Sequence, residues 1–308
     1  MLLVRDELRH TATPGEHAIS IGVFDGVHGG HRMLIGRMLD EARARGLTGG
    51  VVTFHPHPVT VVHPDVSFSY IESLERRVEL LHDLGAAFVS VLTFTSEVQQ
   101  VAAADFTRLL VEEARMRLLV VGEDFRLGRG GEGTVERLRT IGEEQGFEVI
   151  AVPLLADDAG HARISSTRVR EALAAGQMEE VEAFLGHPYV IRGPVLHGEE
   201  RGRLLGFPTL NVGVSPDRAL PPNGVYVTRA LVDDRTYGAV TNVGTRPTFD
   251  GRTTTVETHL LDFGGDLYGH VVTVELVHRL RGEQKFDGVE ALTAQIARDV
   301  QETREWFA

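Results

Sequence analysis

The stretch Ile19-Ser-Ile-Gly-Val-Phe-Asp-Gly-Val-His-Gly-Gly-His31 predicts a buried strand that passes through a glycine-rich turn into a helix. His28 and His31 are three residues apart, so both imidazoles lie on one face of the first helical turn. The glycines leave the backbone bare, and the start of a helix attracts anions. We therefore expect a phosphate group to bind where the strand meets the helix.

Zinc is an alternative ligand for this pair of histidines. His55 and His57 follow the second predicted strand, so a zinc-dependent hydrolase that uses all four histidines is a competing interpretation. The glycines favour phosphate, because a metal-binding helix does not need a bare backbone. The chain has no cysteine, which excludes thiolate metal sites and disulfides.

Composition limits the possible functions. A chain of 308 residues is long enough for two domains, and 42% hydrophobic with 24% charged residues is typical of a globular protein. No apolar run is long enough to cross a membrane, and the first residues do not resemble a signal peptide, so we expect a cytoplasmic protein without a membrane partner. The net charge of −13 argues against a nucleic-acid partner.

Lysine is almost absent from this sequence. Lys285 is the only lysine among 31 basic residues, and the others are arginines. A P-loop needs a lysine after its glycines, so the chain cannot bind ATP in that way. Any anion must therefore be held by local features such as helix starts, histidines and arginine side chains.

The first half of the chain alternates short apolar runs with helical patterns. This alternation predicts an α/β domain with a parallel sheet, helices on both faces and a ligand site beyond the carboxyl ends of the strands. The predicted strands are 18–22, 50–54, 88–94, 118–122 and 148–152, and the predicted helices are 73–84, 105–113 and 134–145.

The pattern changes near residue 186, after a short predicted helix at 177–187. Short strands with glycine and proline turns follow, which predicts an antiparallel β-barrel. A final helix from 287 to about 305 carries an apolar stripe. The barrel strands are expected at 189–196, 225–232, 236–243, 254–261 and 271–280.

The turn at residues 53–58 carries His55 and His57. Two further segments of the first half also carry residues that can bind a nucleotide. Val121-Gly-Glu-Asp-Phe-Arg-Leu-Gly128 follows a predicted strand, and the segment 163–170 reads Arg-Ile-Ser-Ser-Thr-Arg-Val-Arg. Its hydroxyls can cap the next helix or face phosphate, and its arginines offer fork-shaped cations. Taken alone, this segment fits a plain helix cap with surface arginines better than a phosphate site.

The barrel half contains Gly206-Phe-Pro-Thr-Leu-Asn211. In an extended segment Thr209 and Asn211 point to the same side, where a hydroxyl and a carboxamide suit a hydrated Mg²⁺ that bridges nucleotide phosphates. The alternative is two polar residues on the solvent face of a strand.

Glu257 is the candidate base of this half. Strand alternation places it on one face with Thr255 and His259. A carboxylate there can accept a proton from a reacting hydroxyl. The alternative is a structural acid that pairs with Arg279 or Arg281.

Gly22 to His31 resembles the H-x-G-H signature of the nucleotidyltransferase superfamily, in the form typical of bacterial bifunctional riboflavin kinase/FAD synthetases. The turn at 53–58 and the segments 121–128 and 163–170 resemble further elements of the same family. The resemblance covers nearly the whole chain, because riboflavin kinase motifs are similar to 201–211, 242–248, 256–263, 266–269 and 281–287.

This resemblance implies two activities. Residues 1–186 would form a Rossmann-like FMN adenylyltransferase domain, and residues 187–308 would form a β-barrel riboflavin kinase domain. ATP would phosphorylate riboflavin to FMN, and a second ATP would give its AMP to FMN, forming FAD and pyrophosphate. His55 and Asp124 stand where the family commonly has an acidic residue and Asn, so a paralogue that acts on a flavin analogue is a further alternative.

The resemblance also implies the site residues. It assigns catalytic roles to His28, His31, Arg170 and Glu257. It assigns Mg²⁺ binding to Thr209 and Asn211. ATP, riboflavin and FMN are the expected partners, and the chain is expected to be a monomer or weak homo-oligomer. The other expected binding residues are Gly22, Phe24, Asp25, Gly26, His57, Pro58, Gly122, Asp124, Phe125, Ser165, Ser166, Thr167 and Arg168 in the first half, and Gly206, Phe207, Pro208, Asn242 and Arg246 in the second.

Overall fold

The computed structural model describes residues 2–153, 164–198, 201–248 and 251–308. The chain divides into two compact units, Met1–Ser166 and Thr167–Ala308. The boundary at residue 186 stays a prediction; the barrel strands begin just after it, and helices α8 (Ser166–Ala175) and α9 (Met178–Leu185) precede them.

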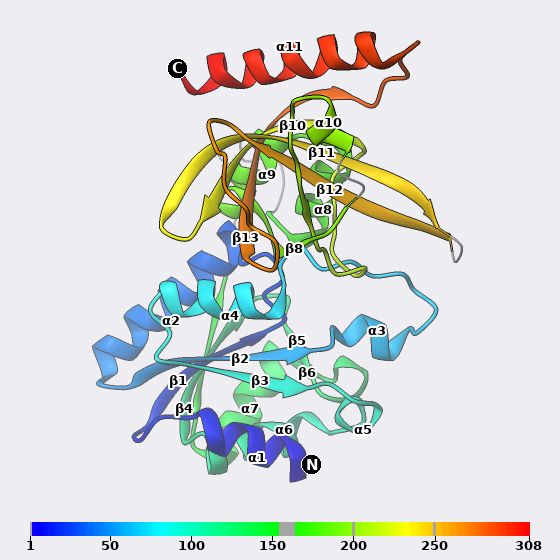
Figure 1. The fold of residues 1–308 in the computed structure, drawn as a ribbon. Coiled ribbons are helices and arrows are strands. Elements are labelled where there is room, and N and C mark those ends of the chain that lie inside the picture. The colour runs from blue at the N-terminus through cyan, green and yellow to red at the C-terminus, as the bar shows by residue number, and fades with distance from the viewer. Residues whose placement is uncertain (1, 154–163, 199–200, 249–250) are drawn as a thin grey trace. The chain divides into compact units, whose positions relative to one another are not determined.

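The first unit is built on a parallel sheet with the strand order β3-β2-β1-β4-β7 (Figure 1). Its strands are β1 (His17–Gly22), β2 (Thr48–His55), β3 (Phe88–Thr93), β4 (Met116–Gly122) and β7 (Glu148–Val152). The predicted parallel sheet is confirmed, and each bound lies within two residues of its prediction. The strand order reverses between β1 and β4, which is where sheets of this kind open a ligand crevice.

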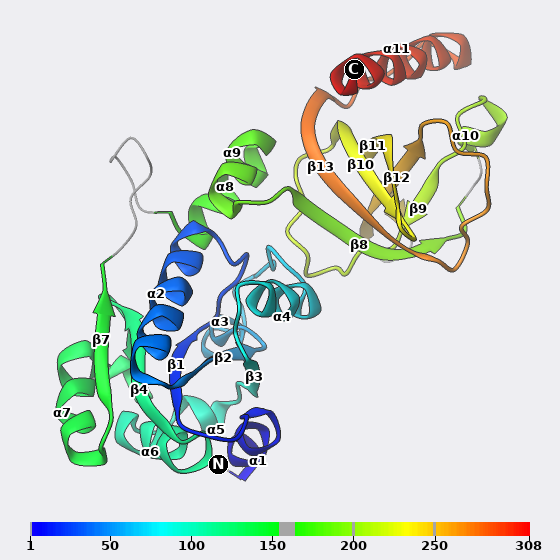
Figure 2. The same cartoon turned by 90° about the vertical axis from the view of Figure 1, so that its left-hand side faces the viewer.

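Helices cover both faces of this sheet (Figure 2). Helices α2 (Gly29–Arg45) and α4 (Leu74–Asp83) supply one buried apolar cluster, and α1 (Leu2–Thr11), α6 (Ala103–Glu113) and α7 (Val135–Gln145) supply the other. Helix α1 was not predicted, because Val4 and Leu8 are its only buried residues. Short elements connect these layers: α3 (Pro58–Val62), α5 (Ser96–Gln99), β5 (Arg126–Leu127), a 3₁₀ turn (Arg129–Gly131) and β6 (Gly133–Thr134).

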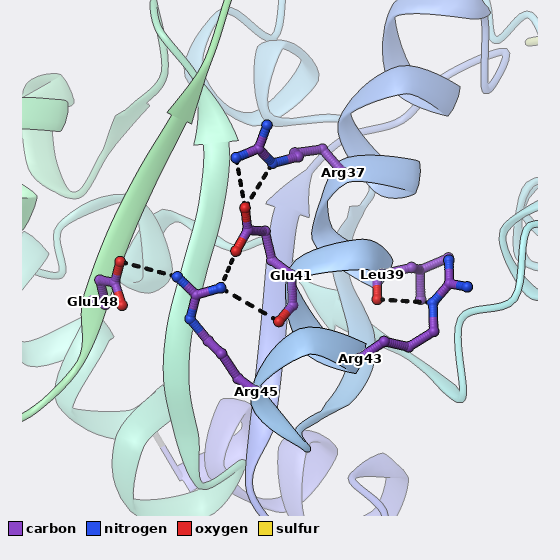
Figure 3. A network of polar contacts seen from close by, with 6 residues as sticks. All are labelled: Arg37, Leu39, Glu41, Arg43, Arg45 and Glu148. Atoms are coloured by element: carbon purple, nitrogen blue, oxygen red, sulfur yellow. Dashed lines mark hydrogen bonds and ion pairs between the residues drawn. The ribbon is translucent and has the colours of Figure 1, made fainter.

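Arginine side chains support the carboxyl end of α2 (Figure 3). Glu41 accepts a hydrogen bond from Arg37 Nε at 2.9 Å and also pairs with Arg45. Arg45 in turn reaches Glu148, the first residue of β7, at 3.3 Å. Partly exposed ion pairs of this kind each contribute at most about 1 kcal/mol. Arg45 therefore joins the helix to a sheet strand.

The second unit contains a closed antiparallel barrel with the order β10-β11-β12-β9-β8-β13, which confirms the predicted barrel (Figure 1). Strand β9 was missed because it has only three residues, too few to show alternation. The strands are β8 (Tyr189–Leu196), β9 (Leu210–Val212), β10 (Gly224–Val232), β11 (Arg235–Thr248), β12 (Gly251–Leu260) and β13 (Val271–Gly282), with helices α10 (Arg201–Leu204) and α11 (Val289–Phe307).

Three buried threonines align across neighbouring barrel strands. The hydroxyl of Thr241 lies 2.8 Å from that of Thr228 and 2.9 Å from that of Thr258, and all three side chains are fully buried. Because side chains alternate along a strand, the next residues, Asn242 and Glu257, face the opposite side of the sheet. The threonine ladder thus fixes which face carries the candidate base.

Candidate active sites

The first unit holds a pocket of about 220 Å³ at the carboxyl ends of β1 and β4, which is the predicted crevice. Nine of the predicted site residues line it: Gly22, Phe24, His28, His31, Gly122, Asp124, Phe125, Ser165 and Ser166. Sequence reasoning missed its apolar wall, formed by Ile21, Met33, Leu34, Val152, Pro153 and Ile164.

The two imidazoles stack at the start of α2. Their ring centroids are 3.7 Å apart, and Phe24 packs edge-on against His31 at 5.2 Å. His28 is the N-cap residue, but its side chain makes no capping hydrogen bond to the helix. A Cβ on Gly30 would lie 3.2 Å from the His28 ring and 3.3 Å from the Ile164 carbonyl oxygen, so a bare backbone fits best here. The arrangement offers an anion the helix start and two ring donors.

The turn before His28 has an unusual backbone. Phe24, Gly26 and Val27 have φ angles of 55°, 86° and 42°. Only glycine adopts such angles freely, and a β-branched residue such as valine is strained there by about 1–3 kcal/mol. This conformation therefore needs support from the surrounding structure.

Asp25 provides part of that support. Its carboxylate is buried and accepts hydrogen bonds from the backbone N–H groups of Ile71 and Glu72 at 3.1 and 3.2 Å. The hydroxyl of Ser166 donates to the Asp25 carbonyl oxygen at 2.8 Å, which joins the serine-rich segment to the histidine turn. The carboxylate of Asp25 is thus directed at the protein backbone, although sequence reasoning placed it among the ligand-binding residues.

The turn after β2 arranges its histidines differently. His57 is the N-cap residue of α3, where its Nδ1 accepts from Val59 N–H at 3.1 Å and its ring packs on Phe68 at 4.1 Å. Pro58 is the first residue of α3. Within the described ranges, no three His, Cys, Asp or Glu side chains gather to hold a metal ion. The zinc interpretation therefore receives no support.

Thr167, Arg168 and Arg170 belong to the second unit. The Arg168 guanidinium lies 4.5 Å from the centre of the Phe184 ring, and it is 3.8 Å from Glu180. These contacts join α8 to α9. Arg163 lies outside the described residues. The phosphate role of this segment stays a prediction.

A large pocket of the barrel unit, about 800 Å³, lies on the face that carries Asn242, Glu257 and His259. Predicted residues Phe207 and Thr209 also line it. Helix α11 closes the pocket with Leu292, Ile296 and Val300, which the sequence showed only as an apolar stripe. Its size and partly apolar lining suit a large aromatic ligand.

A polar row crosses three strands beside this pocket. Glu257 on β12 pairs in register with Asn242 on β11 and with Asn211 on β9. Arg246, also predicted, donates from Nη2 to Glu257 at 3.1 Å. The candidate base therefore pairs with Arg246 and not with Arg281, whose partner is described below.

A second barrel pocket of about 370 Å³ is lined by Arg203, Pro208 and the loop from Phe263 to Tyr268. Thr209 lines both barrel pockets. Gly206, with a φ of 86°, forms the turn that leads into this segment. Ligands bound in the two pockets would both lie beside Thr209.

Arg281 and Asp299 were not predicted as a pair. Asp299 on α11 is 2% exposed, and Arg281 at the end of β13 donates to both of its carboxylate oxygens, at 2.9 and 2.7 Å. This ion pair holds α11, the helix that closes the large pocket, against the end of β13. Asp299 lies beside Ile296 and Val300 on the side of α11 that lines the pocket, and nothing in the sequence indicated its pairing with Arg281.

Asp299→Ala should lower the free energy of unfolding of the barrel unit by about 3–5 kcal/mol, because it leaves a largely buried guanidinium without its partner. Denaturant unfolding can be followed through Trp306, the only tryptophan, which lies on the same helix. The control is Glu302→Ala, which removes an exposed acid of α11. Equal effects of the two variants would contradict a structural role for the pair.

The sequence matches two family models: FAD synthetase over residues 10–168 and riboflavin kinase over residues 185–307. It is 38% identical to the bifunctional riboflavin kinase/FMN adenylyltransferase of Escherichia coli K12, over 100% of this chain and 98% of that protein. The enzyme of the same name from Bacillus subtilis is 35% identical over 94% and 92% of the two chains.

The fold is also similar to a crystal structure named as a macrolide-efflux protein from Streptococcus pneumoniae, with a TM-score of 0.88, 33% identity and 97% of each chain covered. Among the described helices, none combines the length and apolar character that a membrane span requires. Because these relatives match this chain over almost their whole length, the similarity covers both of its units. The chain belongs to the family of bifunctional riboflavin kinase/FMN adenylyltransferases.

Proposed function

We propose that the two units catalyse successive steps of flavin cofactor synthesis, each with its own ATP. The barrel phosphorylates riboflavin to FMN, and the first unit joins FMN to the AMP of a second ATP, giving FAD and pyrophosphate. The observation that carries this proposal is that both family matches occur in one chain, and each match contains a pocket of its own.

In the first unit, an oxygen of the FMN phosphate attacks the α-phosphorus of ATP, and the bond to the pyrophosphate leaving group breaks. The nucleophile is already an anion, so no strong base is required. His28, His31 and the start of α2 stabilise the charge on the phosphates and hold them in line. Arg170 remains the predicted cation for the triphosphate, carried over from the family resemblance.

The flavin ring needs an apolar pocket near this site. A pocket of about 260 Å³ in the same unit is lined by Phe54, Phe94, Phe106 and Leu127. Phe54 lies at the carboxyl end of β2, and Leu127 follows the loop that carries Asp124. We assign the isoalloxazine ring of FMN to this pocket, because aromatic walls suit a flat aromatic ligand.

In the barrel unit, riboflavin occupies the large pocket and ATP the smaller one. Glu257 accepts the proton of the ribityl hydroxyl as that oxygen attacks the γ-phosphorus, and ADP leaves. Glu257 lines the large pocket, and Thr209 lines both pockets, which supports transfer where they meet. The contact with Arg246 orients the Glu257 carboxylate.

The side-chain oxygens of Thr209 and Asn211 would suit a magnesium ion. Thr209 and Asn211 supply neutral oxygens, and Mg²⁺ keeps several waters, so one or two protein oxygens suffice. When bound, the ion would offset negative charge on the phosphates.

Thr209→Val keeps the shape of the side chain and removes its oxygen. We expect the Mg²⁺ concentration that gives half-maximal kinase rate to rise about tenfold or more. The measurement is a Mg²⁺ titration of FMN formation, with Thr273→Val on β13 as the matched control. Identical titration curves for the two variants would rule out a direct role of Thr209.

The proposed function is tested by incubating the purified chain with riboflavin, ATP and Mg²⁺ and separating the flavins by chromatography. We expect FMN to appear first and FAD to follow. A chain that forms neither would contradict the proposal, and formation of only one would restrict it to one unit. A cytoplasmic location and a monomeric or weakly associating state remain predictions from the sequence.

A further inference from the structure

Arg77 is a fully buried arginine in α4, on the helix face that also buries Leu80 and Leu81. Charged side chains are rarely buried without partners, because removing a charge from water costs several kcal/mol. Burial lowers the pKa of its guanidinium, and the neighbouring Asp25 carboxylate opposes that shift. Since guanidinium keeps its proton in proteins, a charge is held inside the first unit. Neither the sequence motifs nor the mechanism above uses it.

The guanidinium joins the turn before His28 to the end of strand β2. Its Nη1 donates to the Val23 carbonyl oxygen at 2.9 Å, and its Nη2 donates to the Phe54 carbonyl oxygen at 3.4 Å. Val23 opens the turn that leads to His28, and Phe54 lies near the end of β2. A fork-shaped side chain can bridge two carbonyls in fixed geometry, which a single ammonium cannot do.

The turn held in this way is the strained one. Between Val23 and His28 the chain passes through the positive φ angles of Phe24, Gly26 and Val27. Strained backbone persists only where its surroundings fix it. Besides Arg77, the hydroxyl of Thr53 donates to the Val23 carbonyl oxygen at 2.9 Å.

Asp25 ties the same turn back to the segment that leads into α4, through the N–H groups of Ile71 and Glu72. Arg77 therefore reaches from α4 to the start of the turn, and Asp25 reaches from the turn to the residues before α4. These reciprocal contacts fix the turn relative to α4 and β2 at once. The stacked imidazoles follow directly from the end of this turn.

We propose that Arg77 is a positioning residue for adenylyl transfer: it holds the turn at residues 23–27 against the end of β2, and so sets where His28 and His31 meet the ATP phosphates. It does not touch the substrate. The inference rests on the proposed function of the first unit and extends it to a residue outside the pocket. Misplacing catalytic groups by about 1 Å costs up to roughly 100-fold in rate.

The test compares Arg77→Met with Arg77→Lys in the full-length chain. Methionine keeps an unbranched apolar stem and removes every donor, whereas lysine restores the charge on a single ammonium group that lacks the fork shape of guanidinium. Arg43→Met, a change on the exposed face of α2, is the control. For each variant, kcat and KM are measured for FAD formation from FMN, and separately for FMN formation from riboflavin, below the unfolding temperature.

We expect Arg77→Met to lower kcat for FAD formation about 10- to 100-fold while KM for FMN changes less than about threefold. Arg77→Lys should recover part of the lost rate. FMN formation should match the unchanged protein in all variants, because the kinase site lies in the other unit. A residue needed only for folding would lower the melting temperature and leave kcat of the folded enzyme unaltered.

Wild-type kcat for FAD formation in folded Arg77→Met would overturn the inference and leave the proposed function intact. No FAD from the unchanged protein would refute the proposed function, and this inference with it. If the first unit of Arg77→Met fails to fold, Arg77→Lys decides: a reduced kcat at unchanged KM supports the positioning role, and wild-type kcat overturns it.

Discussion

His28→Ala should reduce FAD formation about 100- to 1000-fold, while FMN formation continues at the wild-type rate. The imidazole of His28 stands at the N-cap of α2, stacked on His31 and beside the bare backbone of Gly30. Alanine removes one donor from the place where charge builds on the phosphates. The barrel pocket is formed by residues 202–300, so this change leaves its walls untouched.

The measurement follows FAD and FMN separately, with FMN supplied for the first and riboflavin for the second. His10→Ala is the matched control, because His10 is an exposed histidine of α1 in the same unit. Both activities should survive that change. A parallel fall of FMN and FAD formation in His28→Ala would show that the two reactions do not have separate sites.

Glu257→Gln should reduce FMN formation about 100- to 10,000-fold, because glutamine cannot accept the proton of the ribityl hydroxyl. The carboxamide keeps the size of the side chain and an oxygen that can still accept from Arg246. The pocket shape and riboflavin binding should therefore change little, and the loss should fall on kcat. FAD formation from supplied FMN should continue.

The control for this variant is Glu275→Gln, which alters a partly exposed acid of β13 paired with Arg229. It should leave both rates near those of the unchanged protein. Persistent FMN formation in Glu257→Gln would remove Glu257 as the base. The row of side chains formed by Glu257, Asn242 and Asn211 would then have only a structural role.

The sequence predicted the sheet strands well, because each carries a run of buried apolar residues set between glycine turns and helical patterns. It also identified most of the histidine pocket, since Gly22, His28 and His31 lie within one stretch of ten residues. Local sequence determines such a motif. The alternation of strands and helices predicts a parallel sheet, but it does not give the order of the strands.

Residues whose role depends on distant partners gave no such signal. Arg77 has the appearance of a surface arginine on an ordinary helix, and only the folded chain brings it to the carbonyls of Val23 and Phe54. Asp299 similarly meets Arg281 only when α11 packs on the barrel. Thr167 to Arg170 remain predictions, because their segment belongs to the second unit.

The central claim is that two separate sites in one chain use different phosphorus atoms of ATP. The direct measurement supplies riboflavin with ATP labelled at either the α- or the γ-phosphorus and follows both labels into the flavins. We predict only γ-label in FMN and both labels in FAD, with His28→Ala keeping γ-label in FMN and losing almost all α-label. Absence of α-label from every flavin made by the unchanged protein, or loss of both labels together in His28→Ala, would contradict it.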